Sequence, residues 1–313
     1  METGFRAAGP RGLEGAVRED NPVLDYLPDA DGTVALLRDR GGRHLTGDAG
    51  QAMPVFSATK MLIAVAALRL AESGLLGLDD AARGWLPQVP GLITVRELLS
   101  HTAGLPDYAA AGSYVAAVAA QPGRPWGLDQ ILAAALAGDH SPAAAFRYSN
   151  AGYWILGAVM EHAARRPLAR ILDETVLRPV AMASTFYPDV GAGVTSDGYD
   201  TRWAGPAGAA WSTAGDLDRF LAALFDGTLL PARALAAMTA PTPVEAQPPW
   251  RRPAYGLGLM MDRELGTFGH GGAGPGYHAA AFIAPESGRS AVILARSSAS
   301  ADLTAAALRW LAA

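Results

Sequence analysis

A serine and the only lysine of the chain stand three residues apart, where a strongly apolar segment begins. They belong to the tetrapeptide Ser57-Ala58-Thr59-Lys60. On a helix, side chains three positions apart share one face, so Ser57 and Lys60 are close enough to exchange a proton. A serine hydroxyl is a weak nucleophile until a neighbour accepts its proton, and a desolvated lysine can do so because burial lowers its pKa. The pair predicts nucleophilic catalysis, with Ser57 as the nucleophile and Lys60 as its base.

The composition of the chain supports this interpretation. Lysine and arginine together number 25, and all but Lys60 are arginine. Arginine cannot replace a lysine base because its guanidinium stays protonated in proteins. The simpler alternative is that Ser57 caps a helix and Lys60 is a solvated surface charge. The apolar run Met61-Leu62-Ile63 that follows is a poor setting for a solvated charge.

A second polar group is Tyr148-Ser149-Asn150, at the start of another helical segment. Tyr148 could act as a phenolate base if a nearby cation lowered its pKa from about 10. Asn150 could donate to a substrate carbonyl and accept from Lys60. The alternative is a half-buried aromatic followed by a helix cap. Asparagine is scarce in this chain, with only Asn21 besides Asn150, which favours a functional role.

A third group is the glycine-rich run from Gly269 to Gly276, between a strand ending at Phe268 and one starting at Tyr277. Glycines at a strand edge allow another backbone to approach closely. A phosphate-binding loop is a weak alternative because no helix follows the run. Taken alone, His270 is more typical of a structural histidine than of a ligand or base.

The hydrophobic pattern predicts β structure at both ends of the chain and helices between them. The predicted strands are Thr33–Leu37, His44–Thr46, Tyr255–Met261, Thr267–Phe268, Tyr277–Ile283 and Ser290–Ala295. The predicted helices are Ser57–Ser73, Thr94–Leu99, Leu128–Ala137, Ala151–Ala164, Leu168–Val176, Asp216–Phe225 and Asp302–Leu311. The proline-rich stretch Pro241–Pro253 is expected to be a surface loop. The simplest architecture is an α+β fold, in which an antiparallel sheet built from both chain ends is flanked by helices and an all-helical domain is inserted.

Taken together and in this order, Ser57-x-x-Lys60, Tyr148-x-Asn150 and His270-x-Gly272 resemble the class C β-lactamase and DD-peptidase superfamily of penicillin-recognising serine hydrolases. The stretches Leu98–Leu105 and Ala210–Leu217 are also similar to that superfamily. The resemblance covers nearly all of the chain from Gly32 onward. It implies a β-lactamase-like fold, with a sheet domain formed by residues 1–60 and 205–313 and an all-helical domain at 61–204. The active site is expected at the interface of the two domains.

The resemblance also implies a role for each site residue. Ser57 would be acylated by an ester, thioester or amide, while Lys60 and Tyr148 share the general-base work. Substrate binding would involve Asn150, His270, Gly272 and Ala273. The backbone N–H of Ala273 would form an oxyanion hole together with the backbone N–H of Ser57. The resemblance implies no cofactor, and His101, in one of the similar stretches, is expected to hold a loop.

The third motif departs from the β-lactamase pattern, which is typically Lys-Thr-Gly. Here it reads His270-Gly271-Gly272, so both the hydroxyl and the fixed positive charge are missing. Such His-x-Gly variants resemble the peptidases, D-amino-acid amidases and esterases of the superfamily more than its lactamases. We therefore expect weak turnover of β-lactams and activity on short-chain activated esters. An arginine from a neighbouring loop, Arg251 or Arg252, could restore the charge.

Composition excludes several other classes. A net charge of −5 and a pI near 5.7 argue against nucleic acid as the main partner. Cysteine is absent and the six histidines are scattered, so no metal site is predicted. No apolar run is long enough to span a membrane, and the first thirty residues do not resemble a signal peptide. We expect a small-molecule substrate and a cytoplasmic location, unless a leader was removed.

Three functions remain open at this stage. The favoured one is hydrolysis of esters or of small peptides and amides. The second is an acyltransferase of a natural-product pathway, in which an amine or alcohol takes the acyl group from the same serine. The third is a non-catalytic binding protein on the same fold. The retained Lys60 argues against the third, because a disused site in so arginine-rich a chain would more often carry arginine.

Overall fold

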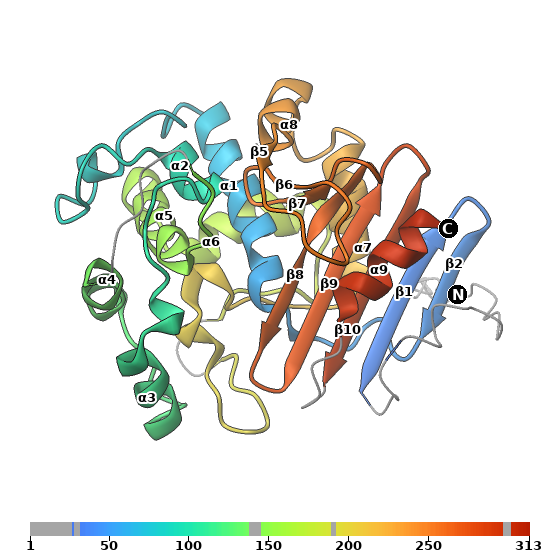
Figure 1. Cartoon of the computed structure of the whole chain (residues 1–313), viewed down its shortest axis with the longest axis horizontal. Helices are drawn as coiled ribbons and strands as arrows, with labels where there is room; N and C mark the ends of the chain where they lie inside the picture. The colour runs from blue at the N-terminus through green and yellow to red at the C-terminus, as the bar shows by residue number, and fades with distance from the viewer. Residues whose placement is uncertain (1–26, 28–31, 138–144, 189–191, 297–301) are drawn as a thin grey trace, which may run out of the picture.

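The computed structural model describes residue 27 and residues 32–137, 145–188, 192–296 and 302–313 (Figure 1). The expectation about a signal peptide concerns the first thirty residues, nearly all of which lie outside these ranges. No helix in the described ranges is long and apolar enough to cross a membrane.

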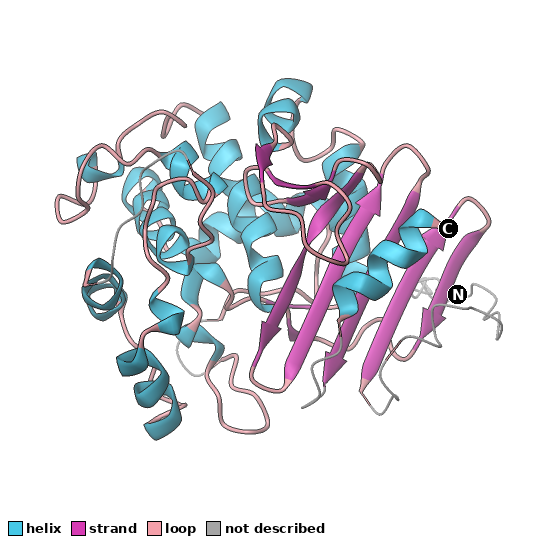
Figure 2. Ribbon diagram, in the orientation of Figure 1, coloured by secondary structure: helices cyan, strands magenta, loops and turns pink. Residues whose placement is uncertain are grey.

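An eight-stranded antiparallel sheet forms one side of the molecule (Figures 1 and 2). Its strand order is β2-β1-β10-β9-β8-β7-β6-β5. β1 pairs with β10, so that Thr33 lies opposite Ala295 and the two ends of the chain meet within the sheet. The bounds are β1 Thr33–Asp39, β2 Gly42–Thr46, β5 Thr242–Pro243, β6 Pro253–Tyr255, β7 Met260–Asp262, β8 Thr267–Gly274, β9 Tyr277–Ala284 and β10 Arg289–Arg296. The predicted sheet from both chain ends is confirmed.

Most of the helices lie on one side of this sheet, and α9 packs over its other face (Figures 1 and 2). Their bounds are α1 Thr59–Glu72, α2 Val95–Ser100, α3 Gly112–Ala120, α4 Leu128–Leu136, α5 Asn150–Ala164, α6 Leu168–Leu172, α7 Ala214–Phe225, α8 Ala232–Met238 and α9 Leu303–Ala312. A short ladder, β3 Met53–Pro54 with β4 Trp211–Ser212, lies between the helical part and the sheet. The structure is therefore a β-lactamase-like α+β fold, as predicted, while the domain boundaries at 60/61 and 204/205 stay predictions.

Both faces of the sheet are covered, because successive side chains of a strand point to opposite faces. On β10, Val292 and Leu294 belong to the main core with α7, whereas Ile293 and Ala295 pack with α9. α1 is buried on nearly every side, from Thr59 to Leu68. It runs through the main core between the other helices and the sheet, and Lys60 lies in its first turn.

Several predicted elements differ from the structure. The single strand predicted over Tyr255–Met261 is two strands, β6 and β7, joined by a turn that contains Gly258 at φ +75°. Strand β8 continues to Gly274, so the third motif lies within a strand rather than between two strands. The expected loop Pro241–Pro253 includes β5 at one end. Helices α3 and α8 were not predicted from the sequence.

Candidate active site

Ser57 lies in a single 3₁₀ turn, Phe56–Ala58, immediately before α1. Two hydrogen bonds to Ala210 fix this turn: the Val55 N–H donates to the Ala210 carbonyl at 3.0 Å, and Thr59 Oγ1 accepts from the Ala210 N–H at 3.1 Å. The structure thus places Ser57 at the N-terminus of a fully packed helix, where backbone N–H groups have no helical partner. The predicted proximity of Ser57 and Lys60 is present, although the helix predicted from Ser57 begins at Thr59 and only Lys60 lies on it.

Lys60 is completely buried and makes three hydrogen bonds through Nζ. It donates to Asn150 Oδ1 and to the Ala207 carbonyl, both at 2.8 Å, and lies 3.1 Å from Ser57 Oγ. The carbonyl and the amide oxygen can only accept, so they always take two of the N–H groups. When Lys60 is neutral, its lone pair must therefore point at the Ser57 hydroxyl. The geometry directs the free base at the nucleophile.

Burial lowers the pKa of Lys60 from its ordinary 10.5 to about 7, and the negative charge of Asp107 partly opposes this effect. The change corresponds to about 5 kcal/mol against the ammonium form. A substantial fraction of the lysine is consequently neutral near pH 7. This is the condition that a lysine base requires at physiological pH.

Tyr148 and Asn150 reach the site because the segment before α5 is fastened to the loop after α2. The His101 carbonyl accepts from the Arg147 N–H at 2.8 Å, and His101 Nδ1 accepts from the Ser149 N–H at 3.2 Å. The His101 ring also packs on the Tyr148 ring, with centroids 4.2 Å apart. His101 therefore holds this segment in place, as the sequence indicated.

Asp107, which was not singled out in the sequence, orients Asn150. Asn150 Nδ2 donates to both carboxylate oxygens, at 3.2 and 3.0 Å, and the Asn150 N–H lies 3.3 Å from Oδ1. A carboxylate can only accept and an ammonium can only donate, so the amide of Asn150 has one satisfactory orientation between Asp107 and Lys60. The predicted contact of Asn150 with Lys60 is present. The amide hydrogens of Asn150, however, face Asp107 rather than an open substrate site.

The environment of Tyr148 disfavours the phenolate considered above. Burial raises the pKa of Tyr148 well above 10, and its interaction with Ser57 only partly opposes this. Lys60 Nζ lies over the face of the Tyr148 ring, 4.8 Å from the centroid, rather than stabilising a charged oxygen. Tyr148 is therefore neutral near pH 7. A neutral phenol can still relay a proton, accepting one as it gives up its own.

The third motif brings β8 against the Ser57 turn. β7 pairs with β8 only as far as Gly269, and no strand in the described ranges pairs with the following edge of β8 on that side. A Cβ on Gly272 would lie 2.2 Å from the Val55 carbonyl oxygen and 3.1 Å from the Ser57 nitrogen. Only glycine permits this approach. It brings the backbone at Gly272 against the Ser57 nitrogen, next to Ala273, whose N–H the sequence predicts as the second oxyanion donor.

His270 cannot supply the missing positive charge. Burial and the nearby Lys60 lower the pKa of His270 to about 3, so the ring is neutral. Its Nε2 accepts from the Tyr255 hydroxyl at 3.0 Å, and its Nδ1 donates to the Gly271 carbonyl. Neither Arg251 nor Arg252 is among the described residues that line the polar hollow around Ser57, and the Arg251 guanidinium pairs instead with Glu264 at 3.2 Å.

Position 271 is glycine and has no hydroxyl, whereas the β-lactamase pattern typically has threonine there. The hydroxyl of a residue distant in the sequence lies next to this position. A Cβ on Gly271 would lie 2.8 Å from Thr304 Oγ1, on the first turn of α9. The hydroxyl of Thr304 thus occupies the space next to the third motif that a side chain at position 271 would need. Sequence alone gave no signal for this contact between residues more than thirty positions apart.

Ser57 lies where two hollows meet. A polar hollow of about 410 Å³ contains Ser57, Tyr148, His270 and Thr304. A largely apolar hollow of about 430 Å³ extends from Ser57 and Asn150 toward the helical part, between Tyr108 and Tyr199. All the site residues predicted from the sequence are thus brought together around one cleft. Within the described ranges, no group of three or more acidic or histidine side chains could hold a metal ion.

Comparison with known proteins agrees with this arrangement. A family model described as Beta-lactamase matches residues 29–313. The chain is 33% identical over 135 residues to penicillin-binding protein 4* of Bacillus subtilis (strain 168), which covers 41% of this chain and 29% of that protein. It is 35% identical over 141 residues to esterase EstB of Burkholderia gladioli, which covers 40% of this chain and 36% of the esterase. These matches span about a third of the length of the two curated relatives.

A solved structure matches over much more of its length. The D-stereospecific amidohydrolase from Streptomyces sp. superimposes with a TM-score of 0.77 and 28% identity, covering 89% of this chain and 93% of that one. The fold is that of the penicillin-binding-protein-like superfamily, whose members are serine hydrolases. Within it, the chain belongs to the beta-lactamase family.

Gly272→Ala tests the close approach of β8 to the Ser57 turn. Because the added Cβ would meet Val55 O and Ser57 N, β8 must shift and separate the two N–H groups. We expect the rate of fluorophosphonate labelling to fall about a hundredfold, the usual effect of losing one oxyanion donor. Gly84→Ala is the matched control, since its Cβ would meet nothing within 4 Å. If Gly272→Ala and Gly84→Ala were labelled at the same rate, the proposed oxyanion hole at the Ser57 turn would be contradicted.

Asp107→Asn tests the electrostatic role of Asp107. The Asp107 charge raises the pKa of Lys60, so its removal lowers that pKa further. The acid limb of the kcat/KM profile, expected near pH 7 in the wild type, should then move to lower pH. Asp79→Asn, a substitution of an exposed aspartate paired with Arg96, should leave the limb in place. A limb that stays fixed or moves to higher pH in Asp107→Asn would count against this role.

Proposed function

We propose that the protein hydrolyses esters or small amides through an acyl-enzyme formed on Ser57. The observation that carries the proposal is the buried Lys60, whose fixed acceptors leave only Ser57 Oγ for its lone pair. A site retained only for binding has no need of a buried lysine with a pKa of about 7. This argues against the non-catalytic alternative.

Acylation follows from the positions of three side chains. Neutral Lys60 takes the proton of Ser57 as Oγ bonds to the substrate carbonyl carbon. The bond to the leaving group then breaks, and the leaving atom needs a proton. Tyr148 donates its phenolic proton to the leaving atom and at the same time accepts the proton that Lys60 holds. Both Lys60 and Tyr148 are therefore neutral at the end of the step. The alcohol or amine departs, and the acyl group stays on Ser57.

Deacylation repeats these steps with water. Water loses a proton through Tyr148 to Lys60 as its oxygen attacks the acyl carbon, and Ser57 recovers a proton when the acid is released. In both halves the developing oxyanion lies between the N–H groups of Ser57 and Ala273. Two such donors in a site that excludes water make a large contribution to transition-state stabilisation.

The apolar hollow beside Asn150 is the proposed acyl site. Its lining in the described ranges contains no charged side chain, and Tyr108, Tyr114, Val118 and Tyr199 contribute to its walls. An uncharged apolar acyl group would gain free energy there by leaving water. Activity on simple esters agrees with the name of the esterase relative, and activity on amides with that of the D-stereospecific amidohydrolase.

Acyl transfer to an amine or alcohol is the second candidate function. It is favoured by the polar hollow on the Tyr148 side of Ser57, which at about 410 Å³ exceeds what a water molecule needs. Product analysis with a small primary alcohol or amine present separates the two functions. Predominant formation of the new ester or amide indicates an acyltransferase, and predominant free acid indicates a hydrolase.

Ser57→Ala tests the nucleophile. A fluorophosphonate should add one label to the wild-type protein, detected by intact mass spectrometry, and none to the variant. The melting temperature should remain close to that of the wild type, because only one oxygen atom is removed. A label found on Ser149 or Ser212, both buried here, would refute the assignment.

Lys60→Arg tests the base while keeping a positive charge. The guanidinium stays protonated and cannot accept the Ser57 proton, so kcat/KM for p-nitrophenyl butyrate should fall at least about a thousandfold. Arg69→Lys is the control on the same helix, where Arg69 donates to the Leu229 carbonyl away from Ser57. Activity of Lys60→Arg within about tenfold of wild type would mean that Lys60 contributes only a positive field.

A further inference from the structure

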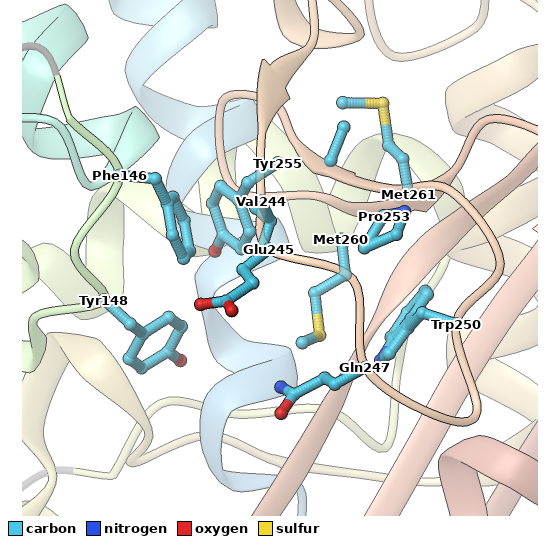
Figure 3. Close-up of a pocket in the computed structure, with 11 residues that line it drawn as sticks. Phe146, Tyr148, Val244, Glu245, Gln247, Trp250, Pro253, Tyr255, Met260 and Met261 are labelled. Atoms are coloured by element: carbon cyan, nitrogen blue, oxygen red, sulfur yellow. The ribbon is translucent and has the colours of Figure 1, made fainter.

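A second cavity opens from the active site beyond Tyr148. It has a volume of about 340 Å³ and adjoins the polar hollow that contains Ser57, because Tyr148, Trp250 and Met260 line both. Figure 3 shows Phe146 and Tyr148 on one side of it and Trp250 on the other. The segment from Val244 to Trp250 forms much of its outer wall.

The cavity is apolar apart from a single carboxylate. Aromatic rings and Met260 form most of its surface, and Glu245 is the one charged side chain among its described lining residues. Glu245 is exposed, and no hydrogen bond or ion pair joins its carboxylate to any residue in the described ranges. In Figure 3 the carboxylate is directed toward the gap between the rings of Phe146 and Tyr148.

The position of Tyr148 decides which part of a substrate the cavity receives. In the function proposed above, on which this inference rests, Tyr148 protonates the leaving atom. The leaving group must therefore lie on the Tyr148 side of Ser57. The apolar hollow toward Asn150 contains Ser57 but not Tyr148, so it is left for the acyl group.

The charged side chains among the described residues that line the cavity and the polar hollow are all carboxylates, although Arg147 lines an adjoining hollow beside Glu245. Neither the cavity nor the polar hollow has a lysine or arginine among its described lining residues. Asp302 adds a second carboxylate at the polar hollow. Buried His270 is neutral near pH 7. A carboxylate on the leaving group would meet repulsion here, whereas an ammonium would be attracted.

We propose that the cavity binds the leaving group of the substrate and selects an apolar group that carries a cationic nitrogen. The substrates would then be esters or amides of apolar, amine-bearing alcohols or amines. Aromatic walls suit the apolar part of such a group, and their faces attract a cation as well. Glu245 pairs with the ammonium at the solvent end of the cavity. Substrates that carry a free carboxylate on the amine side of the bond to be broken, as β-lactams and D-alanyl peptides do, are disfavoured at the same place.

Three butyrate esters that differ only in charge test this selection. Their leaving groups are 4-(aminomethyl)phenol, 4-(hydroxymethyl)phenol and 4-(carboxymethyl)phenol, which share one ring and one linker. We expect kcat/KM to decrease in that order, with the cationic ester about tenfold better than the anionic one, as for a partly exposed charge pair. Raising the salt concentration to 0.5 M should reduce the difference.

Glu245→Gln should lower kcat/KM for the cationic ester about threefold and leave the neutral ester unchanged. Glu264→Gln is the matched control, because Glu264 is an exposed glutamate that pairs with Arg251 and does not line the cavity. Equal rates for the three esters in the wild type, or an unchanged charge preference in Glu245→Gln, would overturn the inference.

Different observations would show that the proposed function, rather than the cavity inference, is wrong. If fluorophosphonate does not label Ser57 and no ester is hydrolysed, the acyl-enzyme proposal fails. The cavity is then tested by ligand-observed NMR with 4-(aminomethyl)phenol and 4-hydroxyphenylacetate. Stronger binding of the amine, lost in Glu245→Gln, would support a cation-selective cavity, and equal binding would refute it.

Discussion

The structure of the cleft depends on one buried amine. Lys60 Nζ lies in the interior of the main core, where about 5 kcal/mol opposes its charged form. Its three partners come from three separate segments: the turn before α1, the first residue of α5, and the turn that ends at Ala207. Placing a proton acceptor beside Ser57 therefore requires the packing of α1 against α5 and the sheet. The all-round burial of α1 therefore supports the proposed catalysis as well as stability.

Close backbone approach is the second constraint on the cleft. The edge of β8 can lie against the Ser57 turn only because position 272 has no side chain, and α9 can approach the same edge because position 271 has none. Gly272 leaves room for the Val55 carbonyl, and Gly271 leaves room for Thr304 of α9. The two glycines thus bring the sheet, α9 and the start of α1 to one point. This explains why the third motif is rich in glycine even though no loop turns there.

Local patterns were predictable from the sequence, and distant contacts were not. The Ser57–Lys60 pair is fixed by helical periodicity, and Tyr148 and Asn150 flank one helix start. The hydrophobic pattern predicted a sheet from both chain ends with helices between them, and the resemblance to a known superfamily implied the β-lactamase-like fold. Asp107 precedes Asn150 by 43 residues, and no periodicity links an aspartate at the start of a 3₁₀ turn to the amide that it orients. The same holds for Thr304 beside the third motif. The phenolate role for Tyr148 failed for a related reason, since burial, which the sequence does not reveal, raises its pKa.

The pKa of Lys60 depends on the positions of the few charged groups around it. Asp107 is kept behind Asn150, so its charge acts on Lys60 through an amide instead of forming a salt bridge that would hold the lysine protonated. A direct carboxylate contact would favour the ammonium more strongly and remove the base. On the other side of Ser57 the chain has a neutral His270 where a β-lactamase typically has a lysine. A second cation there would lower the pKa of Lys60 further and attract carboxylates. With His270 neutral, the pKa of the base is set mainly by burial and Asp107, and recognition of the leaving group is left to the walls of the cavity.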